Sequence, residues 1–403
     1  MRLSDAYEVF LLDLDGVLFR GDQLIASAGP TVDALRTAGK RLVFLTNNSA
    51  RTPQQVAEKL SELGIDAGAE EVVTSAQATA ELLSREATAG SRTAYVIGQD
   101  GIRLALEDAG IAVTDGEESR PEFVVVGWDR GVTYEALRRA TVLVRGGARL
   151  VATNADASYP APGGELWPGA GAILAAVETA SGTRATVAGK PHRPLFETAL
   201  ARAGKGDALV VGDRIETDIA GAVAAGLDAA LVLTGVGTPG ELLDHDALPV
   251  AILPDVGGLV SEHPVPRPRP ATAGDMDAVR GLTDAPDAAR QWGPDGVWVL
   301  ANDTIQATAT VEVRAEDAYL RAVATREEIR GRGLGTLAVA AAAGSARRLG
   351  AATAWLLTEA AEGFFRRLGF ESVGRDSIPG WIEAGPAEGC PQTAVAMRRK
   401  LSQ

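Results

Sequence analysis

The chain has 403 residues, of which 46% are hydrophobic, so it exceeds the usual size of one domain and can build two or three cores. Its net charge of −14 argues against a nucleic-acid partner, because such a partner requires a basic face. A single cysteine excludes an intrachain disulfide, and three histidines leave little material for a histidine-based metal centre. The sequence has neither a span-length apolar stretch nor a basic-then-apolar leader, so we expect no membrane contact and a cytoplasmic location.

The charge is unevenly distributed along the chain. Residues 1–266 carry 22 Lys and Arg against 36 Asp and Glu, whereas residues 267–403 carry 17 of each. Between the acidic and the neutral part, prolines alternate with other residues at 263–270, a pattern that favours an extended polyproline segment. We interpret this segment as a linker between domains.

The first distinctive stretch is residues 9–18, an apolar run that predicts a buried strand and then gives Asp13, Asp15 and Gly16. In an open parallel sheet, ligands bind beyond the carboxyl ends of the strands. Two neighbouring carboxylates repel each other unless a cation lies between them, and their oxygens suit Mg²⁺. The alternative interpretation is a turn after an edge strand, where Asp and Gly are common.

Three further predicted strands are followed by polar or charged side chains. These are Thr46, Asn47 and Asn48 after residues 41–45, Lys190 after residues 186–188, and Asp213 and Asp218 after residues 208–212. Hydroxyl, amide and ammonium groups beside a diacid suit phosphate oxygens. Taken singly, each group also fits an ordinary loop or the start of a helix.

The motifs DxDG, TNNS, GK and GDxxxTD, in this order, resemble those of the haloacid dehalogenase (HAD) superfamily of aspartate-dependent phosphohydrolases. The resemblance covers residues 8–260 and implies an α/β fold with a Rossmann-like parallel sheet. It implies that Asp13 attacks phosphorus to form an aspartyl-phosphate, and that Asp15 protonates the leaving alkoxide and then activates water. Asp at this second position is typical of the phosphatases and mutases of the superfamily, so hydrolysis is favoured.

The same resemblance implies how the site binds its ligands. Mg²⁺ is expected to be held by Asp13, by the backbone carbonyl of Asp15 and by Asp213, with Asp218 supporting the metal shell. The phosphoryl oxygens are expected to be bound by Thr46, Asn47, Asn48 and Lys190. The expected partner is therefore a small phosphorylated metabolite.

Between Asn48 and Lys190 lies a second α/β pattern that is far too long for a loop. Its runs VVVGWDRGVTYEAL, ATNADASYP and PGAGAILAA are similar to the large α/β cap of the type-IIA branch of the superfamily. That branch includes p-nitrophenyl, nucleotide, phosphoglycolate and glycerol-3-phosphate phosphatases. A cap that roofs the site excludes water and favours a small polar substrate. Asn154, Asp156 and Tyr159 are candidate cap contacts, with loop formation as the alternative.

The part after the linker begins with a predicted helix near residues 270–277 and predicted strands at 296–300, 308–313 and 320–325. The following run RGRGLG resembles the GNAT acetyltransferase signature, in which backbone N–H groups at a helix start bind the pyrophosphate of acetyl-CoA. The resemblance implies an α+β domain. Its expected acetyl-CoA contacts are Val323, Thr325, Arg330, Gly331, Arg332, Gly333, Leu334 and Gly335.

The GNAT resemblance departs from the family at Phe365, where many members carry a tyrosine as general acid. A phenyl ring cannot protonate the leaving thiolate. Three interpretations of this domain stay open: an active acetyltransferase, an acyl-CoA-sensing module, and a packing domain without a ligand.

The expected domain boundaries follow from these motifs. They are 1–78 and 184–262 for the HAD core, 79–183 for the cap, 263–270 for the linker and 271–403 for the GNAT-like domain. A homodimer is one expectation, because caps of this branch often mediate dimers.

The sequence therefore predicts a Mg²⁺-dependent phosphatase. Glycerol 3-phosphate is the preferred substrate hypothesis, because a type-IIA phosphatase fused to a GNAT-like domain resembles actinobacterial glycerol-3-phosphate phosphatases. Phosphoglycolate, p-nitrophenyl phosphate and nucleotides are the alternatives within the branch. An acetyltransferase or acyl-CoA-sensing function in the C-terminal domain is the alternative from another class.

Overall fold

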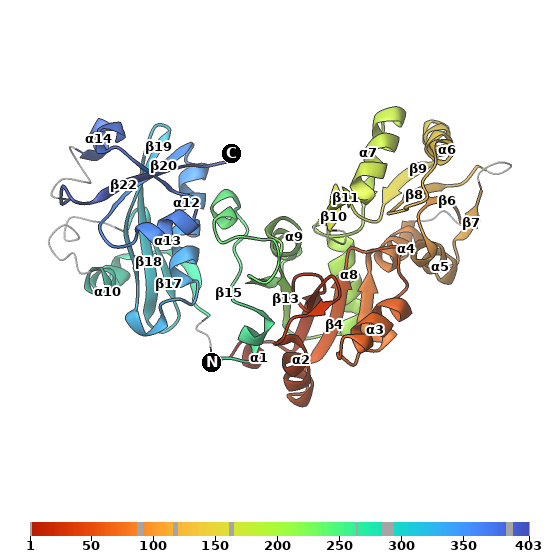
Figure 1. Ribbon diagram of the computed structural model, residues 1–403, viewed down its shortest axis with the longest axis horizontal. Helices are drawn as coiled ribbons and strands as arrows, with labels where there is room; N and C mark the ends of the chain where they lie inside the picture. Colours follow the sequence, from red (N-terminus) through yellow and green to blue (C-terminus); the bar gives the residue numbers. More distant parts are fainter. Residues whose placement is uncertain are drawn as a thin grey trace. The chain divides into compact units, whose positions relative to one another are not determined.

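The chain forms two compact units (Figure 1). The N-terminal unit comprises residues 4–228 and 255–260, and the C-terminal unit comprises residues 1–3, 229–254 and 261–403. The computed structural model describes residues 2–86, 92–115, 120–160, 165–262, 265–283, 294–383 and 390–402. Within these residues, no helix is both long and apolar enough to cross a membrane.

The centre of the N-terminal unit is a parallel sheet with the strand order β13-β1-β4-β5. Its strands are Ala208–Gly212 (β13), Val9–Asp13 (β1), Arg41–Thr46 (β4) and Val72–Thr74 (β5). Strand β13 is buried throughout and β1 is buried up to Asp13, as expected for strands covered on both faces. The register places Val9 beside Ala208 and Arg41, so the carboxyl ends of these strands meet at one edge. The predicted Rossmann-like core is confirmed.

Along the chain, helices alternate with the strands of this core. They are α2 (Ala28–Thr37), α3 (Pro53–Glu62), α4 (Ser75–Glu86), α8 (Arg193–Ala203) and α9 (Ala220–Ala224). The start of α3 is a capping box: the Gln55 N–H donates to Thr52 Oγ1 at 3.2 Å, and the Thr52 N–H donates to Gln55 Oε1 at 3.0 Å. A short hairpin, β2 (Phe19–Arg20) and β3 (Gln23–Leu24), follows the turn after β1.

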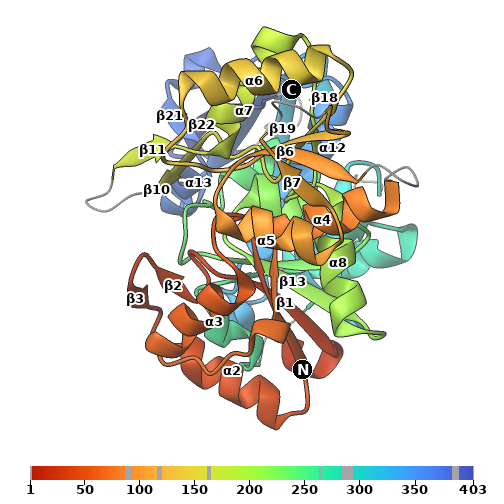
Figure 2. The same cartoon turned by 90° about the vertical axis from the view of Figure 1, so that its right-hand side faces the viewer.

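The cap is a second parallel sheet with the strand order β12-β9-β8-β6-β7. Its strands are Thr93–Ile97 (β6), Ala112–Thr114 (β7), Phe123–Val126 (β8), Arg149–Ala152 (β9) and Thr186–Val187 (β12). Alternate residues of a strand face opposite sides. Val96 packs with α4 and α5 (Asp100–Asp108), whereas Ile97 packs with α6 (Tyr134–Arg145) and α7 (Ala170–Ser181). Figure 2 shows these two helix pairs on the two sides of the sheet.

Strand β12 lies in the cap sheet, whereas the sequence places residues 184–262 in the core. Thr186 pairs with Val151, and Val187 pairs with Ala152. A two-residue strand carries too little pattern to indicate which sheet it joins. Another feature without a sequence prediction is the hairpin formed by β10 (Ser158–Pro160) and β11 (Leu166–Pro168).

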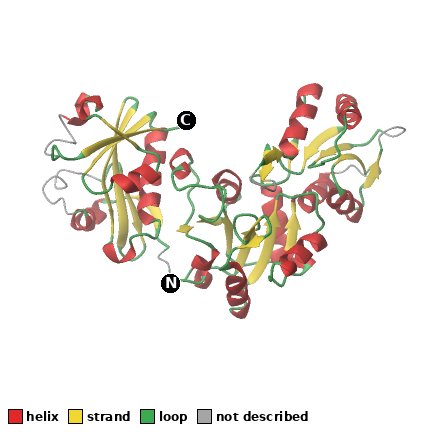
Figure 3. Ribbon diagram, in the orientation of Figure 1, coloured by secondary structure: helices red, strands yellow, loops and turns green. Residues whose placement is uncertain are grey.

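The C-terminal unit contains a mixed sheet with the strand order β16-β17-β18-β19-β20-β22-β21 (Figure 3). Its strands are Arg267–Pro270 (β16), Val297–Ala301 (β17), Ile305–Arg314 (β18), Asp317–Thr325 (β19), Thr353–Thr358 (β20), Glu371–Val373 (β21) and Val395–Lys400 (β22). Its helices are α10 (Met276–Leu282), α12 (Leu334–Arg348), α13 (Glu362–Arg367) and α14 (Gly380–Glu383). Only the β19–β20 pair is parallel among these described strands, which agrees with the predicted α+β domain.

Part of the expected linker is a strand, because residues 267–270 form β16 at the edge of this sheet. Its prolines, Pro268 and Pro270, pair with Leu300 and Trp298 in the register with β17. Proline lacks an N–H group, so it is tolerated at a sheet edge. Prolines two residues apart leave the same edge without donors, while the other edge pairs with β17. An alternating proline pattern therefore suits an edge strand as well as a polyproline linker.

Residues 229–254 form a parallel pair, β14 (Asp228–Val232) and β15 (Ala251–Leu253), and belong to the C-terminal unit. Arginines of the GNAT-like part bind acidic residues of this segment. Arg347 donates to Asp246 Oδ1 at 3.0 Å, and Arg399 donates to Asp244 Oδ2 at 2.5 Å. The Arg399–Asp244 contact is half-buried and the Arg347–Asp246 contact is exposed, and both join the segment to the rest of the C-terminal unit.

Candidate active site

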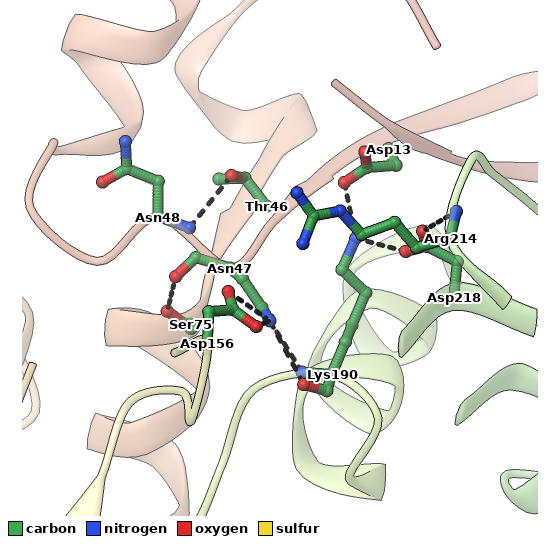
Figure 4. A network of polar contacts seen from close by, with 9 residues as sticks. All are labelled: Asp13, Thr46, Asn47, Asn48, Ser75, Asp156, Lys190, Arg214 and Asp218. Carbon is green, nitrogen blue, oxygen red and sulfur yellow. Dashed lines mark hydrogen bonds and ion pairs between the residues drawn. The ribbon is translucent and has the colours of Figure 1, made fainter. Parts of the chain in front are cut away.

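A buried lysine lies between two carboxylates at the carboxyl edge of the core sheet (Figure 4). Lys190 Nζ is 2.5 Å from Asp13 Oδ1 and 2.6 Å from Asp218 Oδ1. The side chains of Lys190 and Asp218 are only 4% and 1% exposed. Burial by itself lowers the pKa of Lys190, but the two carboxylates outweigh it and raise this pKa, so the ammonium stays charged. The structure thus brings three of the predicted site residues into direct contact.

The carboxylates of Asp13, Asp213 and Asp218 form a cluster whose ligand oxygens all lie within 4.8 Å of one another. Burial raises the pKa of Asp13, and Asp218 and Asp213 add to this rise while Lys190 opposes it. The backbone approaches the cluster closely: a Cβ on Gly16 would lie 2.5 Å from Asp213 Oδ2, and Gly16 has a φ of +82°. A set of hard carboxylate oxygens at a crowded glycine turn fits Mg²⁺.

Asp15 follows β1 in the same turn and is exposed. Its Oδ1 accepts a hydrogen bond from the Gly21 N–H at 3.4 Å. Desolvation by its surroundings raises the pKa of this carboxyl, while the Gly21 N–H, Lys59 and Arg214 act in the opposite direction. A carboxyl with a raised pKa retains a proton more readily, as a general acid must.

The loop after β4 holds the predicted phosphate-binding side chains. Thr46 Oγ1 accepts the Asn48 N–H at 3.0 Å, which leaves its hydroxyl hydrogen to donate to a ligand. Asn47 binds Lys190 twice, because its Oδ1 accepts the Lys190 N–H at 2.8 Å and its Nδ2 donates to the Lys190 carbonyl at 3.1 Å. The Asn47 amide therefore positions Lys190.

Asn48 is exposed, and its Oδ1 accepts the Ala50 N–H at 2.9 Å. Figure 4 shows its amide pointing away from Asp13. This hydrogen bond closes a short turn in which the asparagine side chain binds the backbone N–H two residues further along the chain. Contact between Asn48 and a substrate stays a prediction.

The cap residues Asn154 and Asp156 have different surroundings. Asn154 is buried and donates through Nδ2 to the Asn47 carbonyl at 2.8 Å, so it ties the cap to the core loop. Asp156 accepts a hydrogen bond from Asn47 Nδ2 at 3.2 Å. Burial raises the pKa of Asp156, and Asn47, Arg214 and Lys190 counteract this rise. Asp156 thus lies at the site, next to the predicted phosphate-binding loop.

Two residues of the site were missed by the sequence analysis. Ser75 Oγ donates to the Asn47 carbonyl at 2.7 Å, and Arg214 extends its guanidinium toward the loop after β4 (Figure 4). No sequence pattern marked Ser75 as a site residue, because a serine that starts a helix after a short strand is common. Arg214 had a weak signal, because it is a cation directly after the predicted ligand Asp213.

The predicted acetyl-CoA residues lie together in the C-terminal unit. Val323 and Thr325 are in the last part of β19, beyond the Tyr319–Trp355 pair where the register with β20 ends. The glycine-rich loop then leads into α12, which begins at Leu334. Its glycines Gly331 and Gly333 have φ values of +81° and +77°. A loop with left-handed glycines before a helix is suited to presenting backbone N–H groups.

Other contacts of this region are internal to the protein. Arg330 Nε donates to the Thr325 carbonyl at 3.3 Å, and Arg332 donates to the Glu262 carbonyl at 2.7 Å. The residue that replaces the usual tyrosine, Phe365, is buried and packs edge-on against Phe364 and Phe370. It therefore acts as a core residue.

Comparisons with known proteins agree with this geometry. A family model described as haloacid dehalogenase-like hydrolase matches residues 10–112, and a HAD-hydrolase-like model matches residues 187–259. An acid sugar phosphatase of Staphylococcus haemolyticus is 40% identical over 258 residues, which is 64% of this chain and 96% of that protein. The chain belongs to the haloacid dehalogenase-like hydrolases. Residues 270–370 of this HAD hydrolase match the model of the GNAT acetyltransferase family.

Solved structures extend the similarity beyond the HAD part. A glycerol phosphate phosphatase of Mycobacterium tuberculosis, solved in complex with magnesium, is 30% identical with a TM-score of 0.67, and the match covers 86% of this chain and 93% of that one. A thermostable NPPase of Geobacillus stearothermophilus, solved as a double mutant, is 37% identical with a TM-score of 0.57, and the match covers 64% and 98%. The similarity of the HAD hydrolase described here to the mycobacterial protein thus extends over most of both chains.

Replacing Lys190 by Met removes the counter-charge of the buried Asp13 and Asp218. We expect the free energy of unfolding of the metal-free protein to fall by about 3–5 kcal/mol, because an unpaired buried charge is left behind. Mg²⁺ is expected to restore part of this loss, since a bound cation replaces the missing charge. Urea denaturation with and without Mg²⁺ measures both effects. The exposed Lys205→Met variant is the matched control, and an equal, small effect of both substitutions would contradict the assignment.

Proposed function

We propose that this chain is a Mg²⁺-dependent phosphatase of small organic phosphomonoesters, with glycerol 3-phosphate as its substrate. The observation that carries the proposal is the buried contact of Lys190 with Asp13 and Asp218, beside Asp213. The similarity to a glycerol phosphate phosphatase along 86% of the chain supports the choice of substrate. The similarities to acid sugar phosphatases and to an NPPase support the alternatives within the branch.

The residues at the site supply the steps of hydrolysis. Asp13 attacks phosphorus, and Lys190 orients its carboxylate while keeping a third ammonium proton for a phosphoryl oxygen. The Thr46 hydroxyl donates to another oxygen of the same group. Asp15 gives a proton to the leaving alkoxide and then removes one from the water that cleaves the aspartyl-phosphate. Mg²⁺, when bound by the carboxylate cluster, neutralises charge on the transferring group.

A second candidate function concerns the GNAT-like domain. The observation that favours it is the glycine-rich loop before α12 together with the end of pairing between β19 and β20 after Trp355. We propose that this domain binds acetyl-CoA but transfers its acetyl group poorly, because Phe365 is a buried core residue. A cytoplasmic location and a homodimer stay predictions.

Release of inorganic phosphate from glycerol 3-phosphate, phosphoglycolate, p-nitrophenyl phosphate and a nucleotide, with and without Mg²⁺, tests the leading proposal. Asp15→Asn is expected to reduce kcat/KM for glycerol 3-phosphate by about 10²–10⁴-fold and kcat/KM for p-nitrophenyl phosphate much less, since kcat/KM reports formation of the aspartyl-phosphate and nitrophenolate leaves without a proton. Equal losses on both substrates would contradict the acid role of Asp15. If the unmodified protein released phosphate from none of the compounds, the phosphatase proposal would be wrong.

Titration calorimetry of the intact chain with acetyl-CoA tests the second candidate. We expect binding in the micromolar range at best, and a thiol-release assay with varied amines is expected to give little turnover. A Gly333→Val variant is expected to weaken binding, because a Cβ at this position would lie 2.8 Å from Ile252 Cβ and the residue has a positive φ. Robust acetyl transfer would show that another group replaces the tyrosine. Absence of any heat would favour a domain that serves only packing.

A further inference from the structure

The steps above leave two charged residues of the site, Arg214 and Asp156, without a role. Arg214 directly follows Asp213, and its backbone N–H donates to Asp218 Oδ2 at 3.0 Å. The backbone of Arg214 is therefore held next to the carboxylate cluster. Its side chain is half-buried. In the described part of the chain, its guanidinium makes no hydrogen bond or salt bridge. A half-buried guanidinium without a partner is costly unless a ligand or water satisfies its donors.

Two carboxylates lie near this guanidinium without binding it. The charge of Arg214 acts on both Asp15 and Asp156, yet neither forms a salt bridge with it. Figure 4 shows the guanidinium reaching toward the region between Asp13, Thr46 and Asp156. Arg214 and Asp156 therefore border the same space, and no ion pair joins them across it.

This space lies on the side of the site where the organic part of a substrate must be. Asp15 delivers its proton to the ester oxygen, so a residue near Asp15 lies near the leaving alcohol. Asp156 follows β9 of the cap, and a cap of this kind is expected to roof the site and so to cover that alcohol. In the mechanism above, the phosphoryl group is contacted by Asp13, Thr46 and Lys190. The pair formed by Arg214 and Asp156 is thus placed to contact the carbon chain beyond the ester oxygen.

We propose that Arg214 and Asp156 together recognise a hydroxyl group of the substrate alcohol, so that the enzyme selects phosphates of polyols. The inference rests on the proposed phosphatase function and specifies its substrate class. A guanidinium only donates hydrogen bonds and an ionised carboxylate only accepts them, whereas a hydroxyl does both. A hydroxyl in the space between them satisfies both residues at once.

Other substrate groups fit this pair less well. An alkyl chain leaves the Arg214 guanidinium without a partner and Asp156 with Asn47 alone, which a site built for a hydroxyl penalises strongly. A second anionic group, such as the carboxylate of phosphoglycolate, gains from Arg214 but is repelled by Asp156. The hydrogen bond from Asn47 Nδ2 to Asp156 Oδ2, at 3.2 Å, keeps this carboxylate oriented toward the site. The pair therefore discriminates between substrates by the hydrogen bonding and charge of the group beyond the ester oxygen.

Comparing glycerol 3-phosphate with n-propyl phosphate tests the proposal, because the two differ only in their hydroxyl groups. We expect the unmodified protein to have the higher kcat/KM on glycerol 3-phosphate. Arg214→Met is expected to lower the ratio of the two kcat/KM values by about tenfold, the cost of a lost hydrogen bond to a charged group. The exposed Arg202→Met variant is the matched control and is expected to keep the ratio. A merely structural role of Arg214 would not move this ratio.

Asp156→Asn provides an independent arm of the test. Removing its negative charge is expected to raise the kcat/KM of phosphoglycolate relative to glycerol 3-phosphate by several-fold. If Arg214→Met lowered kcat/KM equally on glycerol 3-phosphate and n-propyl phosphate, Arg214 would instead bind the phosphoryl group and the proposal would be wrong. If Arg214→Met left both kcat/KM values unchanged, the proposal would also be wrong.

Failure of the proposed function is distinguishable from failure of this inference. If the unmodified protein turned over neither compound, the phosphatase proposal would fail on its own. Calorimetric titration of the intact protein with the same two compounds in the presence of Mg²⁺ then decides the inference. Tighter binding of glycerol 3-phosphate, lost in Arg214→Met, supports hydroxyl recognition, and equal affinities contradict it.

Discussion

The site depends on one interaction, the buried contact of the Lys190 ammonium with Asp13 and Asp218. A charge in this environment is tolerated only with its partners in place, so the lysine holds the end of β1 and the helical segment Ile215–Ile219 after β13 together. Lys190 itself follows β12, a strand of the cap sheet, and is bound through its backbone by Asn47 of the core. The same residue thus joins catalysis to the placement of the cap over the core.

The core could be predicted from sequence because its strands are buried on both faces and read as unbroken apolar runs that end in functional groups. Asp13, Asp213 and Lys190 all follow such runs or a short strand, and the structure brings them together. The roles of side chains within the loops were less predictable. Asn47 was expected to bind phosphate, but its amide holds Lys190 and Asp156, contacts between residues far apart in sequence. Arg214 was missed because only its position directly after Asp213 marked it in the sequence.

Element assignments failed where the local pattern fits more than one structure. The alternating prolines before Ala271 fit a polyproline linker, yet residues 267–270 form an edge strand. The sequence could not distinguish the two structures, because only the register with β17 shows that the prolines face away from the neighbouring strand. In the GNAT-like domain the sequence identified the glycine-rich loop, whereas the burial of Phe365 against Phe364 and Phe370 depends on tertiary packing that no local pattern indicates. That packing explains how the domain keeps the fold with a phenylalanine at the position where many members carry the tyrosine.

The central claim is that the Asp13 carboxylate, held by Lys190, becomes phosphorylated during turnover. Acid quenching of the Asp15→Asn variant during reaction with radiolabelled p-nitrophenyl phosphate tests it most directly, because this variant is expected to form the aspartyl-phosphate and hydrolyse it slowly. We predict close to one phosphoryl group per chain, located by mass spectrometry on the peptide that contains Asp13. Label on a different residue, or undiminished turnover in an Asp13→Asn variant, would contradict the account.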